Sequence, residues 1–203
     1  MSLVEGVVQP TYFAKSFLKI VTFLGCIVAY YVINRDRSLF DCLSYKVSLK
    51  GAILLGIAMY LFIMVAYYGL QFLLDFDTIV DNLLAKENIS KDNFIMVALY
   101  ISVVNSFLEE VFFRGFAFLE LKKYLNVKWA SIISATCFAV YHTFIMGSWF
   151  SPFVFVLLMT SLIVGGLIFN YLDQKGSIYP SWFVHMSANL AINTVGLIMF
   201  GLV

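Results

Sequence analysis

Six stretches of this sequence are apolar over the ~20 residues that an α-helix needs to cross the hydrocarbon core of a bilayer. Only short connections separate them, and none of these is a Pro/Gly/Ser-rich linker. The sequence therefore predicts an all-α fold, a polytopic transmembrane helix bundle of about six spans. The predicted spans run approximately over Phe13–Ile33, Ala52–Leu74, Asn93–Leu121, Lys128–Phe144, Phe150–Leu172 and Tyr179–Val203.

The amino-acid composition supports a membrane protein. Of the 203 residues, 62% are hydrophobic and 12% are charged, which leaves too little polar surface to cover a soluble globule. The formal net charge of +1 provides no basic field for nucleic acid. We therefore expect the lipid bilayer as a partner and no nucleic acid, and the composition does not indicate an oligomeric state.

The chain divides into two regions of one continuous bundle. Residues 1–92 hold the N-terminal transmembrane helices and an acidic surface loop, and residues 93–203 hold a helix core with ionisable side chains inside its spans. Lysine and arginine residues gather in the connections after the first, third and fifth spans, so the positive-inside rule places these connections in the cytoplasm and both termini outside. Lys15 and Lys19 lie on the other side and do not fit this rule.

Three formal charges fall inside the third predicted span, in "FLEEVFFRGF" (Phe107–Phe116). An unpaired charge at this depth is costly, so such residues are kept only with partners or with a function. On an α-helix Glu110 and Arg114 are about one turn apart with the acid first, which favours an ion pair. Glu109 points about 100° away from Glu110, and we expect no partner for it on its own helix.

Both histidines of the chain also fall inside predicted spans, His142 in "FAVYHTF" and His185 in "WFVHMSANL". Measured from the basic ends of their helices, both lie at a depth similar to that of Glu109, since each helical residue adds about 1.5 Å. Asn189 follows His185 by four residues and shares its helix face. Phe138 precedes His142 by the same spacing and could wall the site against lipid.

These groups suit the hydrolysis of a peptide bond inside the membrane. A carboxylate and an imidazole can activate water, while a second imidazole and an amide stabilise the oxyanion. The sequence has no HExxH motif of a zinc protease and no GxGD motif of an aspartyl protease. A buried ion pair or a lone histidine can also serve helix packing alone, so a purely structural role of the same groups stays open.

The sequence resembles the CAAX-processing and bacteriocin-processing (CPBP, Abi) family of intramembrane proteases in three ordered motifs. They are EExxxR at Glu109, Glu110 and Arg114, FxxxH at Phe138 and His142, and HxxxN at His185 and Asn189. The resemblance implies an α-helical fold in which Glu109 and His142 activate the water. It also implies that His185 and Asn189 form the oxyanion site, with Glu110, Arg114 and Phe138 in support.

The resemblance leaves a metal cofactor open, because the family is described both as metalloproteases and as metal-free glutamate proteases. Glu109, His142 and His185 could supply a zinc site with an open fourth position. Zinc bound there would leave Glu110 as the remaining strong base, and helix geometry assigns Glu110 to Arg114. We therefore favour a site without a metal, and a divalent metal such as zinc is the alternative.

The short chain favours a bacterial branch of this family. We expect an integral, multi-pass protein of the bacterial plasma membrane whose substrate is a small peptide or a membrane-associated protein. Its role would be peptide processing or self-immunity to a bacteriocin. The alternative is a non-catalytic membrane immunity or scaffold protein that acts by binding, with a polar network that only fixes helix packing.

Overall fold

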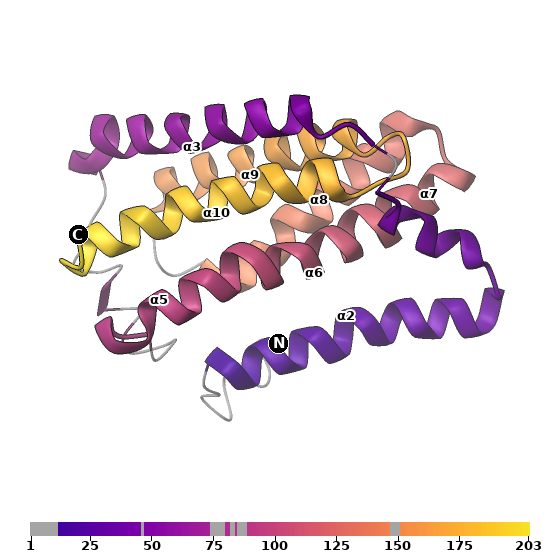
Figure 1. Cartoon of the computed structure of the whole chain (residues 1–203), viewed down its shortest axis with the longest axis horizontal. Coiled ribbons are helices and arrows are strands. Elements are labelled where there is room, and N and C mark those ends of the chain that lie inside the picture. Colours follow the sequence, from indigo (N-terminus) through magenta and orange to yellow (C-terminus); the bar gives the residue numbers. More distant parts are fainter. Residues whose placement is uncertain (1–11, 46, 74–79, 82–83, 85–88, 147–150) are drawn as a thin grey trace.

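The computed structural model describes residues 12–45, 47–73, 80–81, 84, 89–146 and 151–203. Over these residues the chain forms one bundle of long helices and contains no β-strand (Figure 1). The prediction of an all-α polytopic bundle is confirmed. Its main helices are α2 (Tyr12–Asn34), α3 (Lys50–Leu70), α5 (Lys91–Leu99), α7 (Leu119–Tyr124), α8 (Val127–Met146), α9 (Pro152–Leu172) and α10 (Tyr179–Met199).

Five helical segments of the described chain are long and apolar enough to cross a membrane, judged by length and composition. They are α2, α3, α9, α10 and the continuous segment Lys91–Tyr124, which is 34 residues long and runs from α5 to α7. Helix α8 occupies the predicted fourth span and packs along α9, although it is not among these five. The predicted acidic surface loop before Asn93 lies largely outside the described residues.

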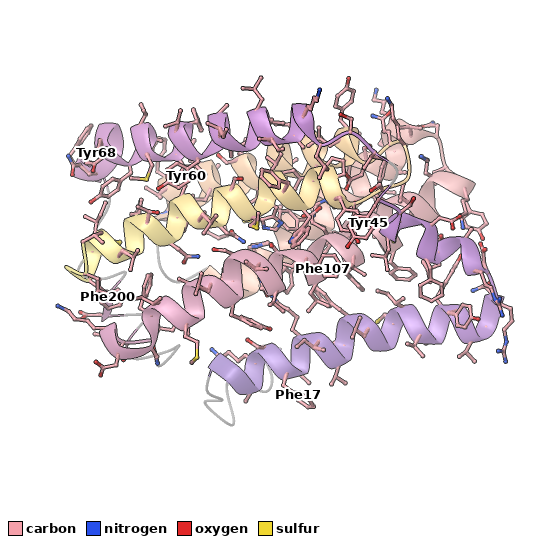
Figure 2. The ribbon with its side chains drawn as sticks, viewed as in Figure 1. Phe17, Tyr45, Tyr60, Tyr68, Phe107 and Phe200 are labelled. Carbon is pink, nitrogen blue, oxygen red and sulfur yellow. The ribbon has the colours of Figure 1, made fainter. Side chains whose placement is uncertain are left out.

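Large apolar side chains cover the outside of the bundle. On α3, Phe62 is 69% exposed and Val65 is 70% exposed, and Figure 2 shows Phe17 of α2 directed away from the other helices. The inner side of α3 packs on α10, where the Tyr60 and Thr194 hydroxyl groups lie 3.0 Å apart and share a hydrogen bond. Apolar side chains on the outside of the bundle are the reverse of the pattern in soluble proteins. They suit surroundings of lipid tails, which solvate apolar side chains as well as a protein interior does.

The three basic connections meet at one end of the bundle. Lys123, at the end of α7, forms an ion pair of 2.8 Å with Asp36 of the first connection, and this contact lowers the pKa of Asp36 to about 2. Lys122 donates a hydrogen bond of 2.7 Å to the backbone oxygen of Gln174, in the connection between α9 and α10. The prediction that these connections share one side is confirmed, and their cytoplasmic orientation stays a prediction.

Helices α8 and α9 approach closely where Gly166 of α9 faces Ala135 of α8. A β-carbon on Gly166 would lie 2.9 Å from the Ala135 β-carbon and 3.0 Å from its α-carbon. At the preceding residue, Gly165, a β-carbon would meet no atom within 4 Å. Small residues at such positions let transmembrane helices pack backbone to backbone.

We expect Gly166→Ala to lower the free energy of unfolding by ~1–3 kcal/mol, because the backbone of α8 must move to admit the methyl group. Gly165→Ala is the matched control and should leave stability unchanged or slightly higher, since alanine forms helix better than glycine. The measurement is the thermal unfolding midpoint of both variants in one detergent. Equal midpoints would show that the close contact between Gly166 and Ala135 does not contribute to stability.

A short 3₁₀ helix, η1 (Arg37–Leu43), carries a buried cysteine. The Cys42 thiol donates to the backbone oxygen of Leu39 at 3.2 Å and lies against Gly115 of the third span. Burial raises the pKa of Cys42 to about 11. Cys26 and Cys137 are exposed on their helices.

We expect Cys42 to resist maleimide at neutral pH in the folded protein, because only the thiolate reacts and a raised pKa lowers its population. Labelling should accelerate as the pH approaches the pKa of about 11, or when the protein is denatured. Mass spectrometry of a Cys26→Ala, Cys137→Ala variant isolates this thiol. Rapid labelling of the folded variant at neutral pH would contradict the burial.

Candidate active site

The third span does not keep a regular α-helical twist. Two π-helical segments, η3 (Tyr100–Asn105) and η4 (Val111–Phe118), flank the short α6 (Ser106–Glu110). Helix α6 carries both glutamates of the first motif. The assumption of a uniform α-helix in this span is therefore wrong, and π turns of this kind occur frequently at functional sites.

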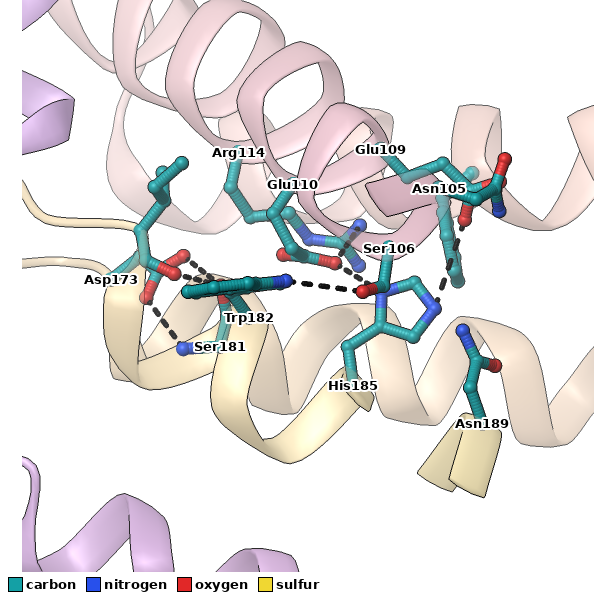
Figure 3. A network of polar contacts seen from close by, with 12 residues as sticks. Asn105, Ser106, Glu109, Glu110, Arg114, Asp173, Ser181, Trp182, His185 and Asn189 are labelled. Atoms are coloured by element: carbon teal, nitrogen blue, oxygen red, sulfur yellow. Dashed lines mark hydrogen bonds and ion pairs between the residues drawn. The ribbon is translucent and has the colours of Figure 1, made fainter. Parts of the chain in front are cut away.

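Side chains of α10 hold that helix against the irregular span. Three of them donate to its backbone oxygens: Trp182 to Val103 at 3.1 Å, Asn189 to Ile101 at 3.2 Å, and Asn193 to Ala98 at 3.1 Å. Hydrogen bonds between membrane helices fix their relative position along the axis. They place His185 of α10 beside the two glutamates of α6 (Figure 3).

Glu109 lies at the centre of the polar cluster and is 2% exposed. Its Oε2 atom is 4.0 Å from His142 Nε2 and 3.7 Å from His185 Nε2. The structure thus brings together three groups from α6, α8 and α10 that the sequence placed at similar depth. Both distances exceed a direct hydrogen bond, so each imidazole faces the carboxylate across a short gap.

The other oxygen of Glu109, Oε1, has two partners that the sequence analysis missed. Lys19 Nζ of α2 lies 2.8 Å away, and Asn105 Nδ2 lies 3.0 Å away, one turn earlier on the same span. The expectation that Glu109 has no partner on its own helix is therefore wrong. Lys19 could have been recognised in the sequence as a candidate, since it is a lysine within an apolar stretch and contradicts the positive-inside rule.

Glu110 and Arg114 form the predicted ion pair, with 3.2 Å between Glu110 Oε1 and Arg114 Nη1 and no exposure of either side chain. The same Oε1 atom lies 2.7 Å from Nδ1 of His185. The Arg114 guanidinium also lies over the rings of Phe138 and Phe169, at 4.3 and 4.9 Å from their centroids, which adds cation–π attraction. Glu110 thus connects the arginine to the imidazole of α10.

Phe138 is buried and contacts both imidazole rings, with centroid distances of 4.6 Å to His142 and 5.8 Å to His185. Its backbone oxygen lies 2.8 Å from Nδ1 of His142. An N–H at this Nδ1 donates to the carbonyl, which leaves Nε2 directed at Glu109. In both histidines, therefore, Nδ1 is held by the protein and Nε2 faces the same carboxylate.

Asp173, directly after α9, is a further buried acid that no motif indicated. It accepts hydrogen bonds from the backbone N–H of Ser181, at 3.2 Å, and from the Ser181 hydroxyl (Figure 3). Burial and the neighbouring Glu110 raise the pKa of this carboxyl well above its usual value. Because Ser181 is in the first turn of α10, Asp173 caps that helix one turn before His185.

The cluster does not fit a metal ion as it stands. Among the described residues, no three His, Cys, Asp or Glu side chains are placed to hold one. The candidate ligands Glu109, His142 and His185 lie around one point, but the ammonium group of Lys19 is 2.8 Å from the carboxylate. A cation at that distance opposes a second cation on the same carboxylate.

A family model matches this part of the chain: the Rce1-like family, type II CAAX prenyl endopeptidases, matches residues 91–191. The chain belongs to this protease family. The matched region of the Rce1-like chain contains all three motifs, from Glu109 to Asn189, and does not include Lys19. No curated protein and no solved structure matches the chain.

Proposed function

We propose that this Rce1-like chain is an intramembrane endopeptidase that hydrolyses a peptide bond in a small peptide or a membrane-associated protein. The role would be bacterial peptide processing or self-immunity to a bacteriocin, in the plasma membrane. One observation carries the proposal: a buried carboxylate of α6 turns one oxygen towards imidazoles from two other helices. Membership of a protease family supports it.

Glu109 and His142 would activate the nucleophilic water. The 4.0 Å between Glu109 Oε2 and His142 Nε2 suits one water molecule hydrogen-bonded to both atoms. As the water attacks the carbonyl carbon, Glu109 takes its proton and can later pass it to the leaving amine. The backbone oxygen of Phe138 holds His142 in the orientation that this step needs.

His185 and Asn189 would stabilise the oxyanion of the tetrahedral intermediate. Because Nδ1 of His185 faces the Glu110 carboxylate, its Nε2 can donate to the oxyanion when the ring is an imidazolium. The Glu110 carboxylate stabilises that cation by a charge-assisted hydrogen bond. Asn189 uses one amide N–H for the Ile101 oxygen, which leaves its second N–H for the oxyanion.

The test uses two substrates. The family description makes a fluorescence-quenched prenylated peptide with a C-terminal CAAX sequence the first probe for the purified chain in lipid nanodiscs. The second is the membrane peptidome of cells with and without the chain, in which an uncleaved peptide should accumulate when the chain is absent. His142→Ala prepared in parallel controls for a contaminating protease. If the chain cleaves neither the probe nor any membrane peptide, the endopeptidase proposal fails.

A further inference from the structure

Lys19 brings α2 into the candidate site from outside the family-matched residues 91–191. Helix α2 lies along the edge of the bundle beside the third span, and only 17% of its span is buried (Figure 1). Lys19 itself is 8% exposed, so one of the few buried positions of this helix holds a lysine. A lysine inside a membrane helix is kept only where a partner or a function compensates its desolvation.

The contacts of Lys19 constrain one side of the Glu109 carboxylate. Lys19 Nζ lies 2.8 Å from Glu109 Oε1 and 2.6 Å from Asn105 Oδ1, and it lies 4.9 Å from the centroid of the Tyr141 ring. The Asn105 amide donates to the same Oε1 at 3.0 Å. Two donors from two helices therefore engage Oε1, while Oε2 faces the two imidazoles.

We propose that Lys19 is a positioning residue of the peptidase: it holds Glu109 through Oε1 so that Oε2, the proposed proton acceptor, points at the nucleophilic water. The inference rests on the proposed function and adds α2 to the working site. Without the ammonium group the carboxylate would keep one donor, Asn105, and could rotate about its last torsion angle. Lys19 acts through Glu109 and does not touch the substrate.

The first test is kinetic and uses the prenylated CAAX peptide with folded protein. We expect Lys19→Met to lower kcat by ~10- to 100-fold with little change in KM, because misplacement of a reacting group affects the chemical step. Lys19→Arg should retain most of the activity, since arginine restores a permanent cation. Lys128→Met, at an exposed position near the start of α8, is the matched control and should leave kcat unchanged.

The second test asks whether Lys19 acts through Glu109. In a Glu109→Gln background, Lys19→Met should cause no further loss of kcat, because residues that act as a unit are not additive. A loss by the same factor in both backgrounds would overturn the inference. If Lys19→Met does not fold, Lys19→Gln replaces it, and a folded Lys19→Gln protein with parental kcat would equally overturn it.

The outcomes separate this inference from the proposed function. If Glu109→Gln keeps full activity, the peptidase mechanism itself fails, and the positioning role of Lys19 fails with it. If Glu109→Gln is impaired while Lys19→Met keeps the parental kcat, the mechanism stands and only the role of Lys19 is excluded.

Discussion

Glu109→Gln is expected to lower the rate of peptide hydrolysis by ~10² to 10⁴, because it removes the basicity of the proposed proton acceptor and keeps its shape. In the parent protein Lys19 and Asn105 donate to Oε1 of the Glu109 carboxylate. The amide oxygen of glutamine can still accept both of these hydrogen bonds. Lys19 loses its counter-charge, so some loss of thermal stability should accompany the loss of rate. Rates must therefore be compared per folded molecule.

The measurement is the initial rate of cleavage of the prenylated probe, together with the yield of processed peptide in cells at matched membrane abundance. If the protein acts by binding, the same substitution should leave its biological effect largely intact, because an amide keeps much of the hydrogen bonding. Full activity of Glu109→Gln in both assays would exclude Glu109 as the base. It would favour the immunity or scaffold alternative.

Arg114→Ala is expected to lower the free energy of unfolding by ~3–5 kcal/mol, because breaking a buried pair leaves one charge without compensation. The substitution leaves Glu110 fully buried beside His185 and removes the guanidinium group that lies over Phe138 and Phe169. Thermal unfolding in detergent measures the change.

The matched control for Arg114→Ala is Lys128→Ala, which removes an exposed cation near the start of α8. A substitution at an exposed position of this kind changes stability little. Lys128→Ala should therefore unfold close to the parent protein. Equal losses of stability from the two substitutions would mean that the buried Arg114 pair stabilises the fold no more than an exposed charge does.

The sequence predicted those features that depend on local spacing. The apolar stretches placed the helices, the spacing of Glu110 and Arg114 predicted their pair, and counting residues from the basic helix ends placed the histidines near Glu109. Asn105 could have been found in the same way, as the polar residue four positions before Glu109. An amide carries no formal charge, so the spacing rule for ion pairs does not select it.

The remaining features depend on how helices distant in sequence pack together. Nothing in the spacing of α2 indicates that Lys19 lies against Glu109, which is 90 positions further along the chain. The cap that Asp173 provides for α10 depends likewise on the turn that returns the chain after α9. The π-helical segments around α6 pack against helices distant in sequence, η3 against α10 and η4 against α8, and hydrophobic periodicity over so short a segment does not resolve them.

The ion pair between Lys19 and Glu109 also bears on which residues belong together when part of this protein is transplanted. The family match begins at residue 91, and the two predicted regions divide at residues 92 and 93, so both boundaries separate the lysine from its acid. Within the matched segment, the carboxylates and the guanidinium of the site are Glu109, Glu110 and Arg114, which sum to one negative charge when both histidines are neutral. With Lys19 the sum is zero. A chimera built by transplanting the matched segment alone would carry every motif residue but would lack the cation that pairs with Glu109. A transplant that keeps this ion pair has to include α2.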